Sequence, residues 1–167
     1  MTTMRILVAG IGNIFFGDDG FGPEVARALA ARPIEGVTIE DYGIRGLHLA
    51  YELVSGYDRA IIIDAVPRGG EPGTLYRIEP EVSQSRAMPD AHRMDLDNVF
   101  AFVATIGGEP PPVTLVGCEP DRAAEGIGLS ARVARAVPPA VELVRRIVEE
   151  ARIAGSLEER KESCSGV

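Results

Sequence analysis

The chain has 167 residues, 46% of them hydrophobic and 25% charged, which fits one domain with a sizeable buried core. Its formal net charge of -8 argues against non-specific nucleic-acid binding. No apolar run is long enough to span a bilayer, and the opening MTTMRILVAGIGN lacks the pattern of a secretory signal, so we expect a cytoplasmic protein without membrane contact.

The first half of the chain predicts three strands and two helices. The strands are expected over residues 5–10 (RILVAG), 37–41 (VTIED) and 60–65 (AIIIDA). The last of them shows no alternation, which is typical of a central strand buried on both faces. A helix is expected from about Gly22 and stops at Pro33. Leu47, Tyr51 and Val54 share one apolar face of a predicted second helix.

The second half predicts two more strands and two more helices. An alternating edge strand is expected over residues 73–79 (GTLYRIE), and a buried strand over residues 113–117 (VTLVG). The apolar faces of the two helices are formed by Leu96, Val99, Phe100, Val103 and Ile106, and by Val137, Val141, Val144, Val148 and Ala151. Residues 80–93 predict a long polar loop, and Ser130 is expected to cap a short helical turn.

Strands and helices alternate along the chain, which predicts an α/β fold. We expect one three-layer domain over residues 1–154, with a twisted, mostly parallel sheet and helices on both faces. Residues 155–167 have little to bury and are expected to form a disordered C-terminal tail. Ligands of such sheets bind outside the carboxyl ends of the strands. The residues at those ends are 10–19, 41–43, 64–65 and 118–119.

The stretch GIGN after the first strand begins like a dinucleotide-binding loop, and Asp41 ends the next strand, where such proteins carry a ribose-binding acid. However, Phe15 occupies the position of the third glycine of that motif. Asp18 and Asp19 would also repel a pyrophosphate. A dinucleotide-binding protein is therefore the less favoured alternative. No Gly-Lys-Ser/Thr sequence is present, which excludes a P-loop.

Nucleophilic sites are weakly represented. The chain has no G-x-S-x-G elbow. Cys118 has His92 and His48 as candidate bases, but free cysteines are mostly small buried hydrophobic residues, which is the favoured interpretation. Adjacent carboxylates such as those of Asp18 and Asp19 do not make an aspartic-protease dyad, which needs two acids from separate segments.

A metal site is the remaining hypothesis. Asp19 follows the first strand, Asp64 ends the central strand, and His92 lies in the long loop. Two carboxylates and an imidazole suit a borderline divalent ion such as Zn or Ni, and three protein ligands leave positions open for a substrate. Two alternatives stay open, because Asp64 also fits a hydrogen-bonded acid at a strand end and His92 a solvated loop histidine.

The order of several motifs resembles the nickel-iron hydrogenase maturation endopeptidases. MRILVAGIGNIFFGDDGFG is similar to the family's opening G-x-G-N followed by D-[DE]-x-x-G, and DYGIRGL is similar to D-x-G-T-x-G-L. AIIIDAV resembles the strand that ends in Asp-Ala, and PGTL, TLVGCEP and IGLS resemble later signatures. Each match is weak alone, and their shared order over nearly the whole chain makes the resemblance specific.

The resemblance implies an endopeptidase that removes the C-terminal extension of a nickel-iron hydrogenase large-subunit precursor after nickel insertion. By motif, the nickel-contacting residues are Asp19, Asp64 and His92, and the nickel arrives with the substrate, although other divalent metals are also expected to bind in vitro. Whether these residues cleave the bond or only recognise the metal stays open. Ile44 stands where many members have Thr. A non-catalytic, metal-binding maturation chaperone is the other alternative.

Overall fold

The computed structural model describes residues 3–81, 89–90, 95–121 and 124–164, and these residues contain one five-stranded sheet in the order β2-β1-β3-β5-β4. The strands are β1 (Ile6–Ile11), β2 (Val37–Gly43), β3 (Arg59–Ala65), β4 (Leu75–Ile78) and β5 (Val113–Cys118). All neighbouring strands are parallel except β4, which runs antiparallel to β5 at the edge. The predicted mostly parallel sheet, with β3 central and β4 at an edge, is confirmed.

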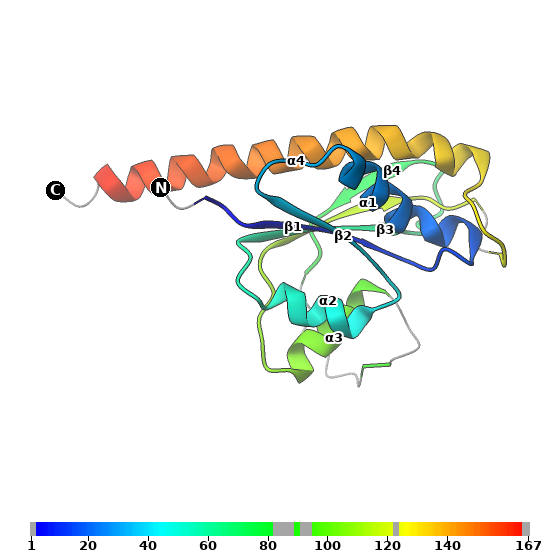
Figure 1. Cartoon of the computed structure of the whole chain (residues 1–167), viewed down its shortest axis with the longest axis horizontal. Coiled ribbons are helices and arrows are strands. Elements are labelled where there is room, and N and C mark those ends of the chain that lie inside the picture. Colours follow the sequence, from blue (N-terminus) through cyan, green and yellow to red (C-terminus); the bar gives the residue numbers. More distant parts are fainter. Residues whose placement is uncertain (1–2, 82–88, 91–94, 122–123, 165–167) are drawn as a thin grey trace.

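Helices cover both faces of this sheet, as predicted. They are the 3-10 turn η1 (Gly17–Gly20) and the helices α1 (Phe21–Ala31), α2 (Gly46–Leu53), α3 (Leu96–Thr105) and α4 (Ala131–Cys164). Figure 1 shows α1 and α4 on one face and α2 and α3 on the other. Each face has its own core, so Ile61 packs towards α1 and α4 while its neighbour Ile62 packs towards α2 and α3. Burial on both faces explains why these strands are apolar without alternation.

The predicted apolar face of α2 is not the face that is buried. Leu49, Ala50 and Leu53 pack into the core, whereas Leu47 is 46% exposed and Tyr51 is 58% exposed. The helix carries apolar side chains at helical spacing on two sides, and periodicity alone cannot decide which side meets the sheet. One apolar face of α2 is therefore left at the surface.

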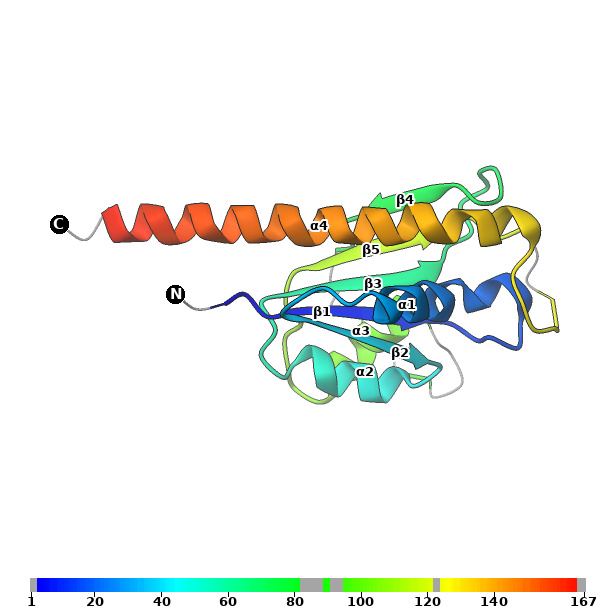
Figure 2. The same ribbon diagram turned by 45° about the horizontal axis from the view of Figure 1, so that its top comes forward.

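The last helix is longer than the sequence suggested. α4 continues to Cys164, where the sequence favoured a disordered tail from residue 155. Its last buried residue is Ala151, and Figure 2 shows its C-terminal part projecting beyond the strands. The prediction correctly recognised that this part has nothing to bury, but an unburied segment can still be helical. None of the helices within the described ranges is long and apolar enough to cross a membrane.

Candidate functional site

Two of the predicted ligands lie at the carboxyl edge of the sheet. β1 and β3 are parallel neighbours, so their carboxyl ends meet. Asp64 lies at the end of β3 and is only 8% exposed. Asp19 lies in η1, which follows β1 and contacts β3. The topology therefore brings these two carboxylates to one place from segments that are far apart in the sequence.

Asp64 is a buried acid in an unfavourable electrostatic environment. Burial raises the pKa of its carboxyl well above the usual range, and the charge of Asp19 raises it further. Asp95 adds a smaller effect in the same direction, and the backbone N–H of Ala65 opposes it. Within the described part of the chain, Oδ1 of Asp64 is buried and has no hydrogen-bond partner. Such an atom is costly to keep unless a ligand completes it.

The loop that carries Asp19 is folded back tightly on the end of β1. Oδ2 of Asp19 accepts a hydrogen bond from the backbone N–H of Asn13 at 2.7 Å. Gly12 has φ +134°, and a Cβ at this position would lie 1.9 Å from the carbonyl oxygen of Asp19. Gly12 therefore has no side chain because the backbone of Asp19 occupies the space that a Cβ would fill. This packing gives no support to a dinucleotide loop, because η1 fills the space beside the glycine.

Asp18 has a structural role that differs from that of its neighbour. It is fully buried and accepts hydrogen bonds from the backbone N–H of Asp121 at 2.9 Å and of Ser130 at 2.7 Å. The hydroxyl of Ser130, the residue directly before α4, donates to it as well, at 2.9 Å. Asp18 thereby ties η1 to the segment that precedes α4.

We expect Asp18→Asn to lower the free energy of unfolding by about 2–3 kcal/mol, because the introduced NH2 group must face one of the N–H or O–H donors. This corresponds to a fall in melting temperature of about 4–10 °C, measured by thermal denaturation. Asp121→Asn is the matched control, since it removes an exposed charge and keeps the backbone donor to Asp18. A melting temperature of Asp18→Asn equal to that of the control would contradict this role.

His92, the third predicted ligand, lies outside the described residues. The nearest described residues before and after it, Asp90 and Asp95, are held at the start of α3. Asp95 caps the helix by accepting from the N–H of Asn98 at 2.8 Å, and the N–H of Asp90 donates to the Asn98 side chain at 2.8 Å. The effect of Asp95 on the pKa of Asp64 places the start of α3 near the acid pair. Among the described residues alone, no three His, Cys, Asp or Glu side chains could hold a metal ion.

The end of β5 carries no nucleophile suited to catalysis. Cys118 is buried, and burial together with the charges of Asp18 and Glu119 raises the pKa of its thiol to about 11, so it stays protonated near neutral pH. Glu119 accepts hydrogen bonds from the N–H of Arg68 at 2.8 Å and the hydroxyl of Tyr76 at 2.8 Å. These bonds lower the pKa of Glu119 and fix the loop that follows Asp64. The interpretation of Cys118 as a buried hydrophobic residue is confirmed.

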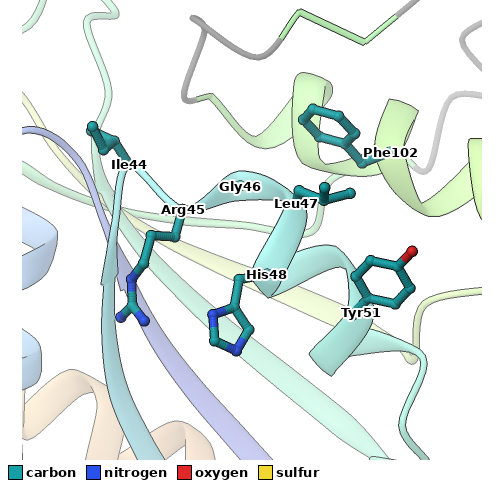
Figure 3. A pocket seen from close by; sticks show the side chains of 7 residues that line it. All are labelled: Ile44, Arg45, Gly46, Leu47, His48, Tyr51 and Phe102. Atoms are coloured by element: carbon teal, nitrogen blue, oxygen red, sulfur yellow. The ribbon is translucent and has the colours of Figure 1, made fainter.

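A groove between α2 and α3 was not predicted from the sequence. It has a volume of about 500 Å³ and is shown in Figure 3. Its lining residues are Ile44, Arg45, Gly46, Leu47, His48, Tyr51 and Phe102. Leu47 and Tyr51, which were predicted to share the apolar face of α2, are exposed here. His48 is exposed as well, and its ring makes a T-shaped contact with the ring of Tyr42, with 5.8 Å between the centroids. These side chains line a surface groove because α2 turns its other apolar face, with Leu49 and Leu53, towards the sheet.

Comparison with known proteins places the chain in a family. A family model described as HycI, hydrogenase maturation protease, matches residues 23–147. The hydrogenase expression/formation protein HupD of Rhizobium leguminosarum bv. viciae is 36% identical over 151 residues, which are 86% of this chain and 74% of that protein. The hydrogenase 2 maturation protease of Escherichia coli (strain K12) is 33% identical over 154 residues, covering 88% of this chain and 92% of the relative.

Solved structures agree with these relatives. The hydrogenase maturating endopeptidase HybD from E. coli has a TM-score of 0.72 and 30% sequence identity, covering 89% of this chain and 94% of that chain. The hydrogenase 2 maturation peptidase from Thaumarchaeota archaeon SCGC_AB-539-E09 has a TM-score of 0.68 and 35% identity, with coverage of 87% and 98%. The fold, the enzyme class and the resemblance found in the motifs are all confirmed. The chain belongs to the hydrogenase maturation protease family.

Proposed function

We propose that this protein removes the C-terminal extension of a nickel-iron hydrogenase large-subunit precursor after nickel has been inserted, and that Asp19, Asp64 and His92 contact that nickel. The observation that carries the proposal is the unpartnered Oδ1 of Asp64, buried beside the charge of Asp19. Two carboxylates that destabilise each other in the free protein gain most from a cation that joins them.

An incomplete ligand set supports a metal that is brought by the substrate. The described acid pair supplies two carboxylates, and His92 would add an imidazole nitrogen, a donor set that suits nickel. Three protein ligands leave coordination positions for the precursor's own groups. Nickel would then be part of the substrate, so the protein would act only on a precursor that carries it.

The chain's own groups have two tasks in this proposal. Asp19 is fixed by the N–H of Asn13, so its carboxylate approaches the nickel in one orientation. Burial and the charge of Asp19 raise the pKa of Asp64 in the free protein, and the positive charge of a bound cation would oppose both effects and favour the ionised carboxylate. A carboxylate of this pair is also placed to accept a proton from the water that attacks the scissile carbonyl. The precursor's nickel, when bound, would polarise that carbonyl.

Incubation of the protein with nickel-loaded and nickel-free precursor tests the proposal. We expect mass spectrometry to show loss of the C-terminal extension only from the nickel-loaded precursor. His92→Ala is expected to slow this cleavage by about 100-fold or more, because it removes one of three ligands to the substrate's metal. Arg146→Ala is the control, since it removes an exposed basic side chain of α4 that belongs neither to the proposed ligand set nor to the groove between α2 and α3.

Each other result of this experiment has a definite meaning. Equal cleavage of both precursors would overturn the recognition of nickel. Tight binding of the nickel-loaded precursor without any change in its mass would identify a chaperone. Thermal denaturation with added ligands is a separate test. A melting temperature that a dinucleotide raises and that nickel or zinc leaves unchanged would favour the nucleotide-binding alternative.

A further inference from the structure

We propose that the groove between α2 and α3 binds a large apolar side chain of the precursor's C-terminal extension, close to the bond that is cleaved. This inference rests on the proposed function, because the occupant is part of the substrate. Figure 3 shows Leu47 and Tyr51 of α2 grouped with Phe102 of α3, while Arg45 and His48 project together on the other side. A volume of about 500 Å³ suits one or two large side chains.

The groove is lined by exposed apolar side chains that do not contribute to the core. Ile44 is 62% exposed, Leu47 is 46% exposed and Tyr51 is 58% exposed, although α2 already fills the core with Leu49 and Leu53. Single exposed apolar side chains are ordinary, but a group of them around one groove marks an interaction site. The chemistry of the lining selects an apolar partner group.

Hydrogen bonds from backbone N–H groups link the loop that carries Asp19 to the segment at which the groove begins. The N–H of Asn13 holds the carboxylate of Asp19, and the N–H of the preceding Gly12 donates to the carbonyl of Gly43 at 3.0 Å. Ile44, the first lining residue, follows Gly43 directly. These two hydrogen bonds hold the start of the groove and the loop of Asp19 against each other at the ends of β1 and β2. The substrate polypeptide is therefore the natural occupant.

The charge at the groove favours the extension as the segment that enters it. The guanidinium of Arg45 donates to the carbonyl oxygens of Tyr42 and Asp41 and lies 3.5 Å from Glu40, yet its side chain is 48% exposed. A cation held in this way loses little conformational freedom when it pairs with a carboxylate. The C-terminus of a polypeptide carries such a carboxylate. His48 is also exposed, and it lies beside Arg45 (Figure 3). We therefore assign the groove to the C-terminal side of the scissile bond.

Leu47→Glu and Phe102→Ala test the proposal in steady-state cleavage of nickel-loaded precursor. We expect KM to rise roughly tenfold or more in each, with kcat near the wild-type value, because the lost contact is made equally before and during the reaction. Ile153→Glu is the matched control, since Ile153 is 60% exposed on the distant part of α4, and it should leave KM unchanged. Circular dichroism of all three variants verifies that they are folded.

A second substrate identifies the occupant. A precursor whose large apolar extension residues are replaced by serine should show the same rise in KM with the wild-type protein. When the Leu47→Glu protein cleaves this precursor, KM should rise no further, because the two changes remove the same contact. Fully additive effects on KM would overturn the proposal.

Other occupants give different results. If mature large subunit without the extension competes as strongly as the precursor, and Leu47→Glu weakens that competition, the groove holds the folded body of the subunit and the proposal is wrong. If light scattering shows a wild-type dimer that Leu47→Glu dissociates, the groove holds a second copy of the chain. If the wild-type protein cleaves no precursor, the proposed function fails. If the wild-type protein cleaves and the groove variants match it, only the groove assignment fails.

Discussion

Asp64→Asn is expected to slow cleavage of the nickel-loaded precursor by about 100-fold or more and, at the same time, to raise the melting temperature of the protein. The loss of activity follows from the proposed role of the carboxylate as a ligand to the precursor's nickel or as a base. An amide keeps the shape of the side chain but supplies neither the charge nor the basicity. A gain in stability together with a loss of activity is the mark of a residue kept for function.

The gain in stability follows from the raised pKa of Asp64. The unfolded carboxyl has a pKa of about 3.9, and the folded protein holds the proton more tightly because of burial and the charge of Asp19. Stability is therefore greatest below the unfolded pKa and falls as the pH rises through the folded pKa. An amide does not titrate, so it avoids the cost of holding a charge in this buried position beside Asp19. The advantage of Asp64→Asn should be small near pH 4 and grow with rising pH.

Thermal denaturation at a series of pH values measures this effect. We expect Asp64→Asn to gain about 1–3 kcal/mol at pH 8, which is a rise of about 2–10 °C in melting temperature. Asp97→Asn removes the same charge from an exposed position in the first turn of α3, and it should leave cleavage near the wild-type rate and show no growing advantage with pH. If Asp64→Asn were less stable than wild type at pH 8, the ionised carboxylate of Asp64 would have to have favourable partners in the free protein, and this prediction would be wrong.

The layers of the fold were predictable because burial leaves a direct pattern in the sequence. Strands covered on both faces have continuous apolar runs, and helices covered on one face have apolar residues at helical spacing. The meeting of Asp19 and Asp64 was predictable for a related reason, since parallel neighbouring strands end at the same edge. His92 stays a prediction that rests on the family resemblance and on the position of Asp95 near Asp64.

Other features depend on contacts that no local pattern encodes. The partners of Asp18 lie 103 and 112 residues further along the chain, so the sequence cannot distinguish its anchoring role from the ligand role of Asp19. The orientation of α2 depends on which of two apolar faces meets the sheet. The start of α4 at Ala131 is concealed by Pro138 and Pro139, which favour the first turn of a helix but lie inside this one.

Gly22→Ala is expected to be among the most destabilising single-methyl changes in the chain. A Cβ on Gly22 would lie 2.2 Å from the carbonyl oxygen of Ile11 and 2.2 Å from that of Ile63, and neither backbone atom can rotate away. The first turn of α1 must then move off β1 and β3, at a cost of at least about 3 kcal/mol in the free energy of unfolding. This should lower the melting temperature by about 6 °C or more, as measured by calorimetry.

The same substitution in another helix separates packing from helix propensity. At Gly155 in α4, an added Cβ meets only the flexible end of the Met4 side chain, at 2.6 Å. Alanine is favoured over glycine in a helix interior by about 1 kcal/mol, so Gly155→Ala should leave the melting temperature unchanged or raise it. Opposite signs at the two positions would show that Gly22 is required by the close approach of α1 to the strand ends that carry the acid pair. A melting temperature of Gly22→Ala equal to that of Gly155→Ala would show that α1 does not approach the strands this closely.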